Sequence, residues 1–264
     1  MSKSYQDKVV WITGGGSGIG RALVLEFVQQ GAAVAVSGRR VDRLDAVVQE
    51  VTDRGGQALA VSCDVTDEAS VEQAVATVAQ HFGRLDVAVA NAGFAVTGAI
   101  ETLSAEDWRR QLDVNVVGAA ITARHALPLL RKHSGRMVLI SSVAGHISAP
   151  RSGAYCASKY AVRAIGQALA AELHGSGVSC TTIYPGYVES EIAQVDNDGV
   201  YHPERADKRP QRFMWSVDRA ARVMVAAITR RQRDFVFTWH GKFGAWIGRH
   251  APWFAHFVLT RGRK

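Results

Sequence analysis

Short runs of apolar residues alternate with longer amphipathic stretches along most of the chain. The apolar runs are rich in Val, Ile and Ala, which is typical of strands buried on both faces of a parallel sheet. They predict strands at residues 9–13, 33–37, 57–61, 87–90, 136–140, 179–183 and 235–238. Apolar residues three and four positions apart predict helices at about 18–30, 42–54, 67–82, 105–132, 154–175 and 216–231. We therefore expect an α/β fold with a doubly wound, Rossmann-type parallel sheet and helices on both faces.

One internal segment breaks this pattern. Residues 190–215 are polar, contain Pro and lack periodicity, so we interpret them as a flap over a binding site. The strand and helix pattern resumes after the flap, which argues against a linker between domains. We therefore assign residues 1–238 to a single catalytic domain, and residues 239–264 to a basic, aromatic C-terminal extension of that same domain.

Charge is distributed unevenly along a chain of ordinary globular composition. The 264 residues are 47% hydrophobic and 21% charged. Residues 201–264 carry 14 of the 31 Lys and Arg but only 4 of the 24 Asp and Glu. The first 200 residues show no basic patch with a reading motif, so we expect no nucleic acid as a partner.

The cysteines and the apolar runs predict the compartment. Cys63, Cys156 and Cys180 are odd in number and far apart, without the spacing of a metal site or a redox pair. The first residues are polar, and no stretch has 18 uninterrupted apolar residues, so we expect neither a secretory signal nor a spanning helix. These features favour a cytoplasmic protein without a metal.

A glycine-rich loop joins the first predicted strand to the first predicted helix. Its glycines permit a tight turn that brings backbone N–H groups to a pyrophosphate at the helix N-terminus. A Walker-type loop is excluded, because Arg21 and Ala22 follow where Lys and Ser or Thr are required. Dinucleotide binding remains, with contacts expected from Gly14, Gly16, Ser17, Gly18, Ile19 and Gly20.

The end of the second predicted strand indicates which dinucleotide binds. An acidic residue there accepts hydrogen bonds from the adenosine ribose of NAD, but Gly38 stands at that position. Arg39 and Arg40 follow, and a guanidinium is well suited to a 2′-phosphate. We therefore expect NADP(H) as the cofactor.

Further short motifs follow the other predicted strands in order. Asp64-Val65 follow the third strand, Asn91-Ala92-Gly93 the fourth, Ser141-Ser142 the fifth and Pro185-Gly186 the sixth; Asn115 and the run Tyr155-Cys156-Ala157-Ser158-Lys159 lie on predicted helices. In this order, and with the glycine loop, the chain resembles the short-chain dehydrogenase/reductase family, with its TGxxxGxG and YxxxK motifs. The resemblance covers roughly residues 7–190 motif by motif.

The resemblance implies cofactor contacts from several loops. Asp64 and Val65 would contact the adenine, and Asn91, Ala92 and Gly93 would line the cofactor. Pro185, Gly186 and Val188 would border the nicotinamide. Two positions depart from the family pattern: Ala90 precedes Asn91 where a second Asn is common, and Ser190 stands where Thr often contacts the carboxamide.

Tyr155 and Lys159 are four residues apart on a predicted helix, so they share one face a single turn apart. Reduction of a carbonyl needs a proton for its oxygen, and a phenol with an ordinary pKa near 10 is a poor reversible donor at neutral pH. The charge of Lys159 would favour the phenolate. In the family, this lysine also binds the nicotinamide ribose, so both residues are candidates for catalysis and for cofactor binding.

Two further residues complete the catalytic set. Ser142 lies at the end of the fifth predicted strand, thirteen residues before Tyr155, where its hydroxyl can donate to the substrate oxygen as charge develops. The resemblance implies that Asn115 kinks its helix and holds a water that passes protons toward Lys159. The loops expected at the substrate mouth are largely apolar; they contain Phe94, Val96, His146, Ile147, Tyr187 and Ile192.

The last segment combines aromatic and basic residues. Trp215, Trp239, Trp246 and Trp253 are four of the six tryptophans, and Pro252 divides the tail into two short pieces. Such an end can lie in a membrane interface, pack on a partner subunit or cover the substrate pocket. The sequence favours packing, with peripheral membrane contact as the alternative.

Together these features predict an NADP-dependent oxidoreductase that acts on an apolar ketone, aldehyde or secondary alcohol. A 3-oxoacyl-thioester reductase of lipid synthesis is an alternative, and a non-catalytic NADP(H)-binding regulator is an alternative from another class. The family resemblance also implies a homodimer or homotetramer built on the helices predicted at 105–132 and 154–175.

Overall fold

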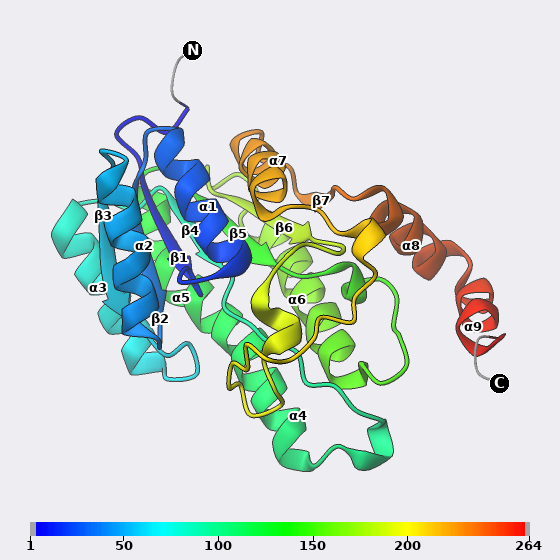
Figure 1. Ribbon diagram of the computed structural model, residues 1–264. Coiled ribbons are helices and arrows are strands. Elements are labelled where there is room, and N and C mark those ends of the chain that lie inside the picture. Colours follow the sequence, from blue (N-terminus) through cyan, green and yellow to red (C-terminus); the bar gives the residue numbers. More distant parts are fainter. Residues whose placement is uncertain (1–3, 262–264) are drawn as a thin grey trace.

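The computed structural model describes residues 4–261 and contains a seven-stranded parallel sheet (Figure 1). The strand order is β3-β2-β1-β4-β5-β6-β7. Strands β2 and β3 therefore lie on one side of β1, and β4 to β7 lie on the other side. In the register, Val10 of β1 pairs with Val34 of β2 and with Val87 of β4. The strands are β1 (Val9–Thr13), β2 (Ala33–Gly38), β3 (Ala58–Ser62), β4 (Val87–Ala90), β5 (Arg136–Ile140), β6 (Ser179–Tyr184) and β7 (Asp234–Val236).

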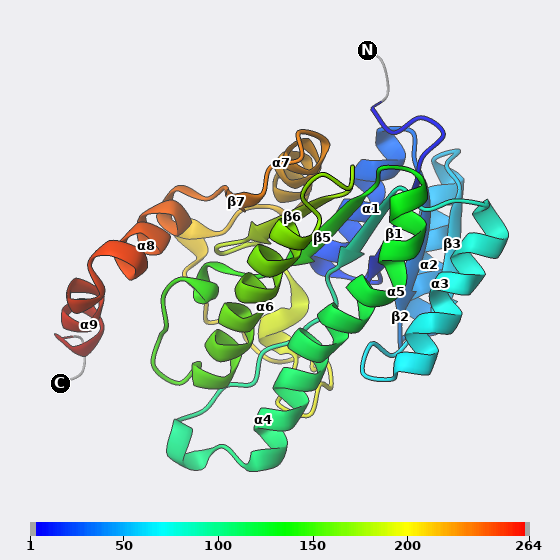
Figure 2. The same cartoon turned by 180° about the vertical axis from the view of Figure 1, so that it is seen from behind.

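Helices cover both faces of the sheet, because successive strand residues point to opposite faces. Val10 and Ile12 pack in the core beneath α1 (Gly18–Gln29), α2 (Val41–Asp53) and α7 (Val217–Thr229). Val9 and Trp11 pack in a second core beneath α3 (Glu68–Phe82), α5 (Gly118–Lys132) and α6 (Gly153–Glu172), the helices nearer the viewer in Figure 2. The predicted three-layer α/β fold is confirmed.

The helix expected over 105–132 is interrupted. It consists of α4 (Ala105–Leu112), a π-helical turn (Asp113–Val117) and α5. The π turn holds Asn115, the residue for which the family resemblance implies a kink. The apolar spacing continues through the turn, which is why the sequence pattern predicts one helix.

The last strand is shifted from its predicted position. β7 ends at Val236 rather than at residue 238, because the Thr238 hydroxyl accepts a hydrogen bond from Gly241 N and caps the next helix (3.2 Å). Two short helices follow, α8 (Trp239–His250) and α9 (Pro252–Arg261), as Pro252 predicts. Within residues 4–261, no helix has the length and apolar character needed to span a bilayer.

The reversal between β1 and β4 positions the candidate site. Loops that leave adjacent strands in opposite directions open a crevice at the carboxyl ends of the strands. The loops after β1, β4, β5 and β6 meet there, and the segment between β6 and α7 passes over them (Figure 1).

Candidate active site

A cleft of about 450 Å³ lies at the carboxyl ends of the strands. All the residues predicted to bind the cofactor line it, from the glycine loop to Ser190. Ser142, Tyr155 and Lys159 line it as well, whereas Asn115 does not. The structure therefore brings together one continuous site from residues spread over most of the chain.

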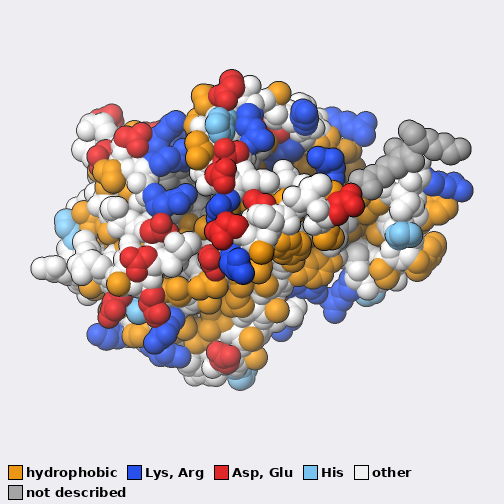
Figure 3. Space-filling model, turned by 90° about the horizontal axis from the view of Figure 1, so that it is seen from below, with side chains coloured by type: hydrophobic (Ala, Val, Ile, Leu, Met, Phe, Trp, Pro, Cys, Tyr) orange, Lys and Arg blue, Asp and Glu red, His pale blue; other side chains and the backbone are white. Residues whose placement is uncertain are grey.

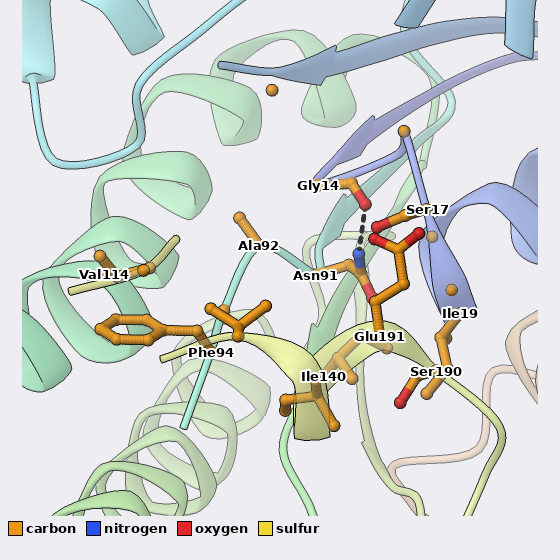
Figure 4. Close-up of a pocket in the computed structure, with 18 of the residues that line it drawn as sticks. Gly14, Ser17, Ile19, Asn91, Ala92, Phe94, Val114, Ile140, Ser190 and Glu191 are labelled. Atoms are coloured by element: carbon orange, nitrogen blue, oxygen red, sulfur yellow. Dashed lines mark hydrogen bonds between the residues drawn. The ribbon is translucent and has the colours of Figure 1, made fainter. Parts of the chain in front are cut away.

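The glycine loop is tied to the loop after β4. The Asn91 amide donates to the carbonyl oxygens of Thr13 and Gly14, both at 3.0 Å, and the bond to Gly14 is drawn in Figure 4. The Thr13 hydroxyl accepts from the backbone N–H groups of Asn91 (3.1 Å) and Ala92 (3.2 Å). Gly14 has φ of 64°, and a Cβ there would lie 2.8 Å from Ala92 Cα, so the close approach requires glycine.

The N-terminus of α1 opens onto the cleft. The helix begins at Gly18 and has no acidic residue in its first turn, so its free N–H groups present positive potential. The side chain of Ser17, which precedes the helix, caps no N–H of the helix and accepts from Arg40 Nη2 instead (3.1 Å). This end of the cleft is well suited to a pyrophosphate.

Three arginines gather where β2 meets α2. Arg39 and Arg40 line the cleft as predicted, and Arg43 joins them from the first turn of α2. Arg40 pairs with Glu191 of the flap at 3.3 Å, and Arg43 lies 4.0 Å from the same carboxylate. Figure 4 shows the side chain of Glu191 reaching toward Ser17.

Sequence reasoning missed Arg43, Glu191 and Tyr201 at this end of the cleft. The Tyr201 ring lies 5.8 Å from the guanidinium carbons of both Arg40 and Arg43. Arg43 carries a signal in the sequence, because it lies one helical turn after Arg40. Glu191 and Tyr201 carry none, because their position depends on how the flap folds back.

The far end of the cleft holds the tyrosine and lysine of α6. Lys159 Nζ lies 5.7 Å from the centre of the Tyr155 ring and donates to the carbonyl oxygen of Ile140 (3.0 Å). Ser142, at the end of β5, accepts from Ala144 N at 3.1 Å and borders the same cavity. A phenol, an ammonium and a hydroxyl thus converge on one space.

Burial dominates the pKa values of both α6 residues. It raises the pKa of Tyr155, although a hydrogen bond from Ser142 and the charge of Arg209 oppose it. Burial also lowers the pKa of Lys159 to about 8. The phenol is therefore protonated at neutral pH, which is the form that can donate to a carbonyl oxygen, and Lys159 is charged.

Asn115 lies behind the wall of the cleft, buried at 2% exposure. Its amide donates to the Phe94 carbonyl and to Ser158 Oγ, both at 3.0 Å, and its oxygen accepts from Phe94 N (3.1 Å). The Ser158 hydroxyl donates in turn to the Tyr155 carbonyl (2.7 Å). Asn115 therefore links the loop after β4 to the turn of α6 that carries Tyr155.

The expected substrate mouth is only partly correct. Phe94 and Ile192 line the cleft. Val96 is fully buried in a small core of its own, and Tyr187 stacks on His240 outside the cleft (5.4 Å between ring centres). His146 and Ile147 lie beneath α8, because the glycines of that helix let it approach their backbone closely.

The flap is held on both sides of the cleft. Asn197 exchanges hydrogen bonds with the backbone of Thr97, both at 3.0 Å, and Arg110 pairs with Asp198 at 2.8 Å. Arg209, which the sequence did not single out, donates to the carbonyl oxygens of Val188 (3.0 Å) and Ser190 (2.9 Å). These contacts fix the flap over the cofactor end of the cleft.

Comparison with known proteins identifies the family. The family model described as short chain dehydrogenase matches residues 8–200. A 3beta-hydroxysteroid dehydrogenase of Mediterraneibacter gnavus is 33% identical over 191 residues, covering 72% of this chain and 69% of that protein.

Two solved structures share the fold. A short chain dehydrogenase/reductase from Burkholderia phymatum in complex with NAD has a TM-score of 0.79 and 27% identity, covering 88% of this chain and 89% of that one. The alcohol dehydrogenase from Thermococcus sibiricus complexed with 5-hydroxy-NADP has a TM-score of 0.76 and 26% identity, covering 88% and 96%. With the glycine loop and the convergence of Tyr155, Lys159 and Ser142 on one cleft, these matches show that the chain belongs to the short-chain dehydrogenase/reductase family of oxidoreductases.

Proposed function

We propose that the protein transfers a hydride between NADP(H) and the carbonyl or secondary alcohol group of an apolar small molecule. The observation that carries the proposal is the placement of Tyr155, Lys159 and Ser142 around one end of a cleft whose other end is built for a dinucleotide. NADPH, when bound, would supply the hydride to the carbonyl carbon.

The protein's own residues would handle the oxygen and its proton. The Tyr155 hydroxyl would give its proton to the carbonyl oxygen as negative charge develops there, and the Ser142 hydroxyl would donate a hydrogen bond to the same oxygen. The charge of Lys159 would then stabilise the phenolate that remains. In the oxidative direction, the phenolate would remove the proton from the alcohol.

The preference for NADP(H) rests on charge at the adenosine end. Arg39 and Arg40 offer guanidinium groups to a 2′-phosphate, and Gly38 places no carboxylate at the end of β2. Arg40 forms an ion pair with the Glu191 carboxylate, an anionic group that a 2′-phosphate would displace.

The preference for an apolar substrate rests on the apolar side chains of the cleft. Its lining includes Phe94, Val114, Ile140, Ile192 and Val195. The steroid dehydrogenase among the relatives supports a bulky apolar substrate. We further propose a cytoplasmic homodimer or homotetramer that uses α5 and α6, because Val117, just before α5, and Tyr160 of α6 are exposed.

The test is NADPH oxidation, with NADH in parallel, across ketones and aldehydes of graded size that include steroid-like and 3-oxoacyl compounds. Tyr155→Phe serves as the blank, and Tyr160→Phe is the matched control, since Tyr160 lies on the same helix outside the cleft. We expect turnover of an apolar ketone that is lost in the blank and kept in the control. Tight NADPH binding without turnover of any compound would instead favour a non-catalytic regulator, and turnover confined to 3-oxoacyl thioesters would favour the reductase of lipid synthesis.

A further inference from the structure

Helix α8 packs against the body with the face that carries its glycines, although its sequence would lead us to expect the aromatic face there. Its inward face is made of glycines, and a Cβ at Gly248 or Gly241 would collide with the loop after β5 or with Thr238. Gly244 lies on the same face, where a Cβ would be 3.5 Å from Val143. The helix is therefore held against the body through its smallest residues.

Three aromatic side chains of α8 point away from the body, whereas Ile247 is buried beside the glycines. Trp239, Phe243 and Trp246 recur at helical spacing and are 63%, 58% and 58% exposed. The next helix repeats the arrangement, with Trp253 72% and Phe257 44% exposed. In a helix that serves only to cover a core, these side chains would be buried.

All the charged side chains of α8 and α9 are basic. Asp234 is the last acidic residue of the chain, and α8 and α9 carry Lys242, Arg249 and Arg261. Figure 3 shows orange, blue and pale blue side chains together at the right-hand end of the molecule. Aromatic residues with Lys and Arg beside them, without carboxylates, complement the headgroups of an anionic bilayer.

The two helices also project from the sheet as an arm (Figures 1 and 2). The base of the arm lies beside the substrate side of the cleft, where Tyr187 stacks on His240 and Phe213 lies 5.5 Å from the Trp239 ring. Gly186, which lines the cleft, lies against His240. A surface bound by the arm would therefore lie beside the cleft.

We propose that α8 and α9 form a peripheral membrane-binding surface, with Trp239, Phe243, Trp246, Trp253 and Phe257 inserted at the headgroup level of a bilayer rich in anionic phospholipids. Lys242, Arg249 and Arg261 bind the headgroups. This proposal is independent of the substrate and cofactor proposed above, because its test requires no turnover.

The test uses the full chain and flotation with vesicles of phosphatidylcholine, alone or mixed with phosphatidylglycerol. We expect the mixed vesicles to bind the protein and the neutral vesicles to bind it at least about tenfold more weakly. Trp246→Gln with Trp253→Gln should weaken binding about tenfold or more, since each removes an exposed interfacial side chain. Ile100→Gln is the matched control, because Ile100 is 70% exposed on a turn outside both helices.

Two double variants distinguish binding by the basic residues of the arm from binding caused by the overall positive charge of the protein. Lys242→Gln with Arg249→Gln should weaken binding to mixed vesicles about tenfold, whereas Arg109→Gln with Arg124→Gln, which removes two exposed charges from α4 and α5, should not. Equal binding by the arm variants and the controls would overturn the proposal. Self-association that depends on Trp246 and Trp253, without vesicle binding, would overturn it in favour of a second copy of this chain.

Discussion

Glu191 of the flap forms an ion pair with Arg40 across the cofactor cleft, with 3.3 Å between Oε2 and Nη2. Arg40 also donates to Ser17 at the start of α1, so one guanidinium joins the flap to the glycine loop. A phosphate that reaches Arg40 has to displace this carboxylate or share the arginine with it.

Removal of the Glu191 charge should therefore favour the phosphorylated cofactor. We expect Glu191→Gln to bind NADPH several-fold more tightly, because Arg40 and Arg43 lose a competing anion, while NADH affinity changes less. Dissociation constants from fluorescence titration measure both effects. Glu101→Gln, an exposed residue outside the cleft, is the control, and an unchanged NADPH affinity in Glu191→Gln would contradict the competition.

Loss of the arginines should have the opposite effect. We expect Arg39→Ala and Arg40→Ala each to weaken NADPH binding about tenfold, which corresponds to about 1.4 kcal/mol, with little change for NADH. Arg54→Ala at the other end of α2 removes an exposed charge of the same kind and should leave both constants unchanged. Equal losses for NADPH and NADH would point to the pyrophosphate or to the fold of the loop rather than to the 2′-phosphate.

The pKa of Lys159 sets a limit on the pH range of reduction. Burial lowers this pKa to about 8, so the ammonium is charged below pH 8 and loses its proton above it. The charged form stabilises the phenolate that Tyr155 becomes, so we expect kcat/KM for reduction to fall as pH rises through about 8. A profile that stays flat to pH 10 would contradict this role for Lys159.

The partly buried His146 should make stability depend on acid. Burial, with a smaller effect from Arg163, lowers its pKa to about 4, whereas the unfolded chain has a pKa near 6.5. Between these values the unfolded chain binds a proton that the folded chain does not, so stability is complete above about pH 6.5 and falls as the pH drops to 4.

The loss in the free energy of unfolding between pH 6.5 and pH 4 amounts to at most about 3 kcal/mol. Thermal melts from pH 7 to pH 4 measure it, with His146→Phe expected to show a smaller fall in Tm than the unmodified protein. His174→Phe is the control because His174 is exposed. Parallel curves for His146→Phe and the unmodified protein would mean that other groups account for the acid sensitivity.

Local spacing in the sequence predicted the sheet and most of the site. The glycine loop, Tyr155 with Lys159, and Ser142 each depend on a strand end or one helical turn, which a short stretch of sequence determines. The parallel sheet then brings strand ends to one edge, so residues from 14 to 209 meet in one cleft.

Contacts between distant segments could not be predicted in this way. Glu191 reaches Arg40 because Asn197 holds the flap to Thr97, and neither loop has a periodicity that reveals the other. Periodicity alone missed the π turn at Asn115, because Val114 and Val117 continue the apolar spacing of a helix, although the family resemblance implied a kink there. His146 was expected at the substrate mouth because the sequence did not reveal that α8 would pack over its loop.

The attachment of the flap at both edges has a kinetic consequence. Asn197 and Thr97 lie on one side of the cleft, and Glu191 and Arg40 on the other, so a dinucleotide beneath the flap cannot leave until one of these contacts breaks. In the proposed reaction, substrate and product would enter and leave at the end of the cleft that holds Tyr155. We therefore expect ordered kinetics, in which the dinucleotide binds first and leaves last. Because release of the dinucleotide is the same step for every substrate, it should set one upper limit on kcat for all substrates that react quickly.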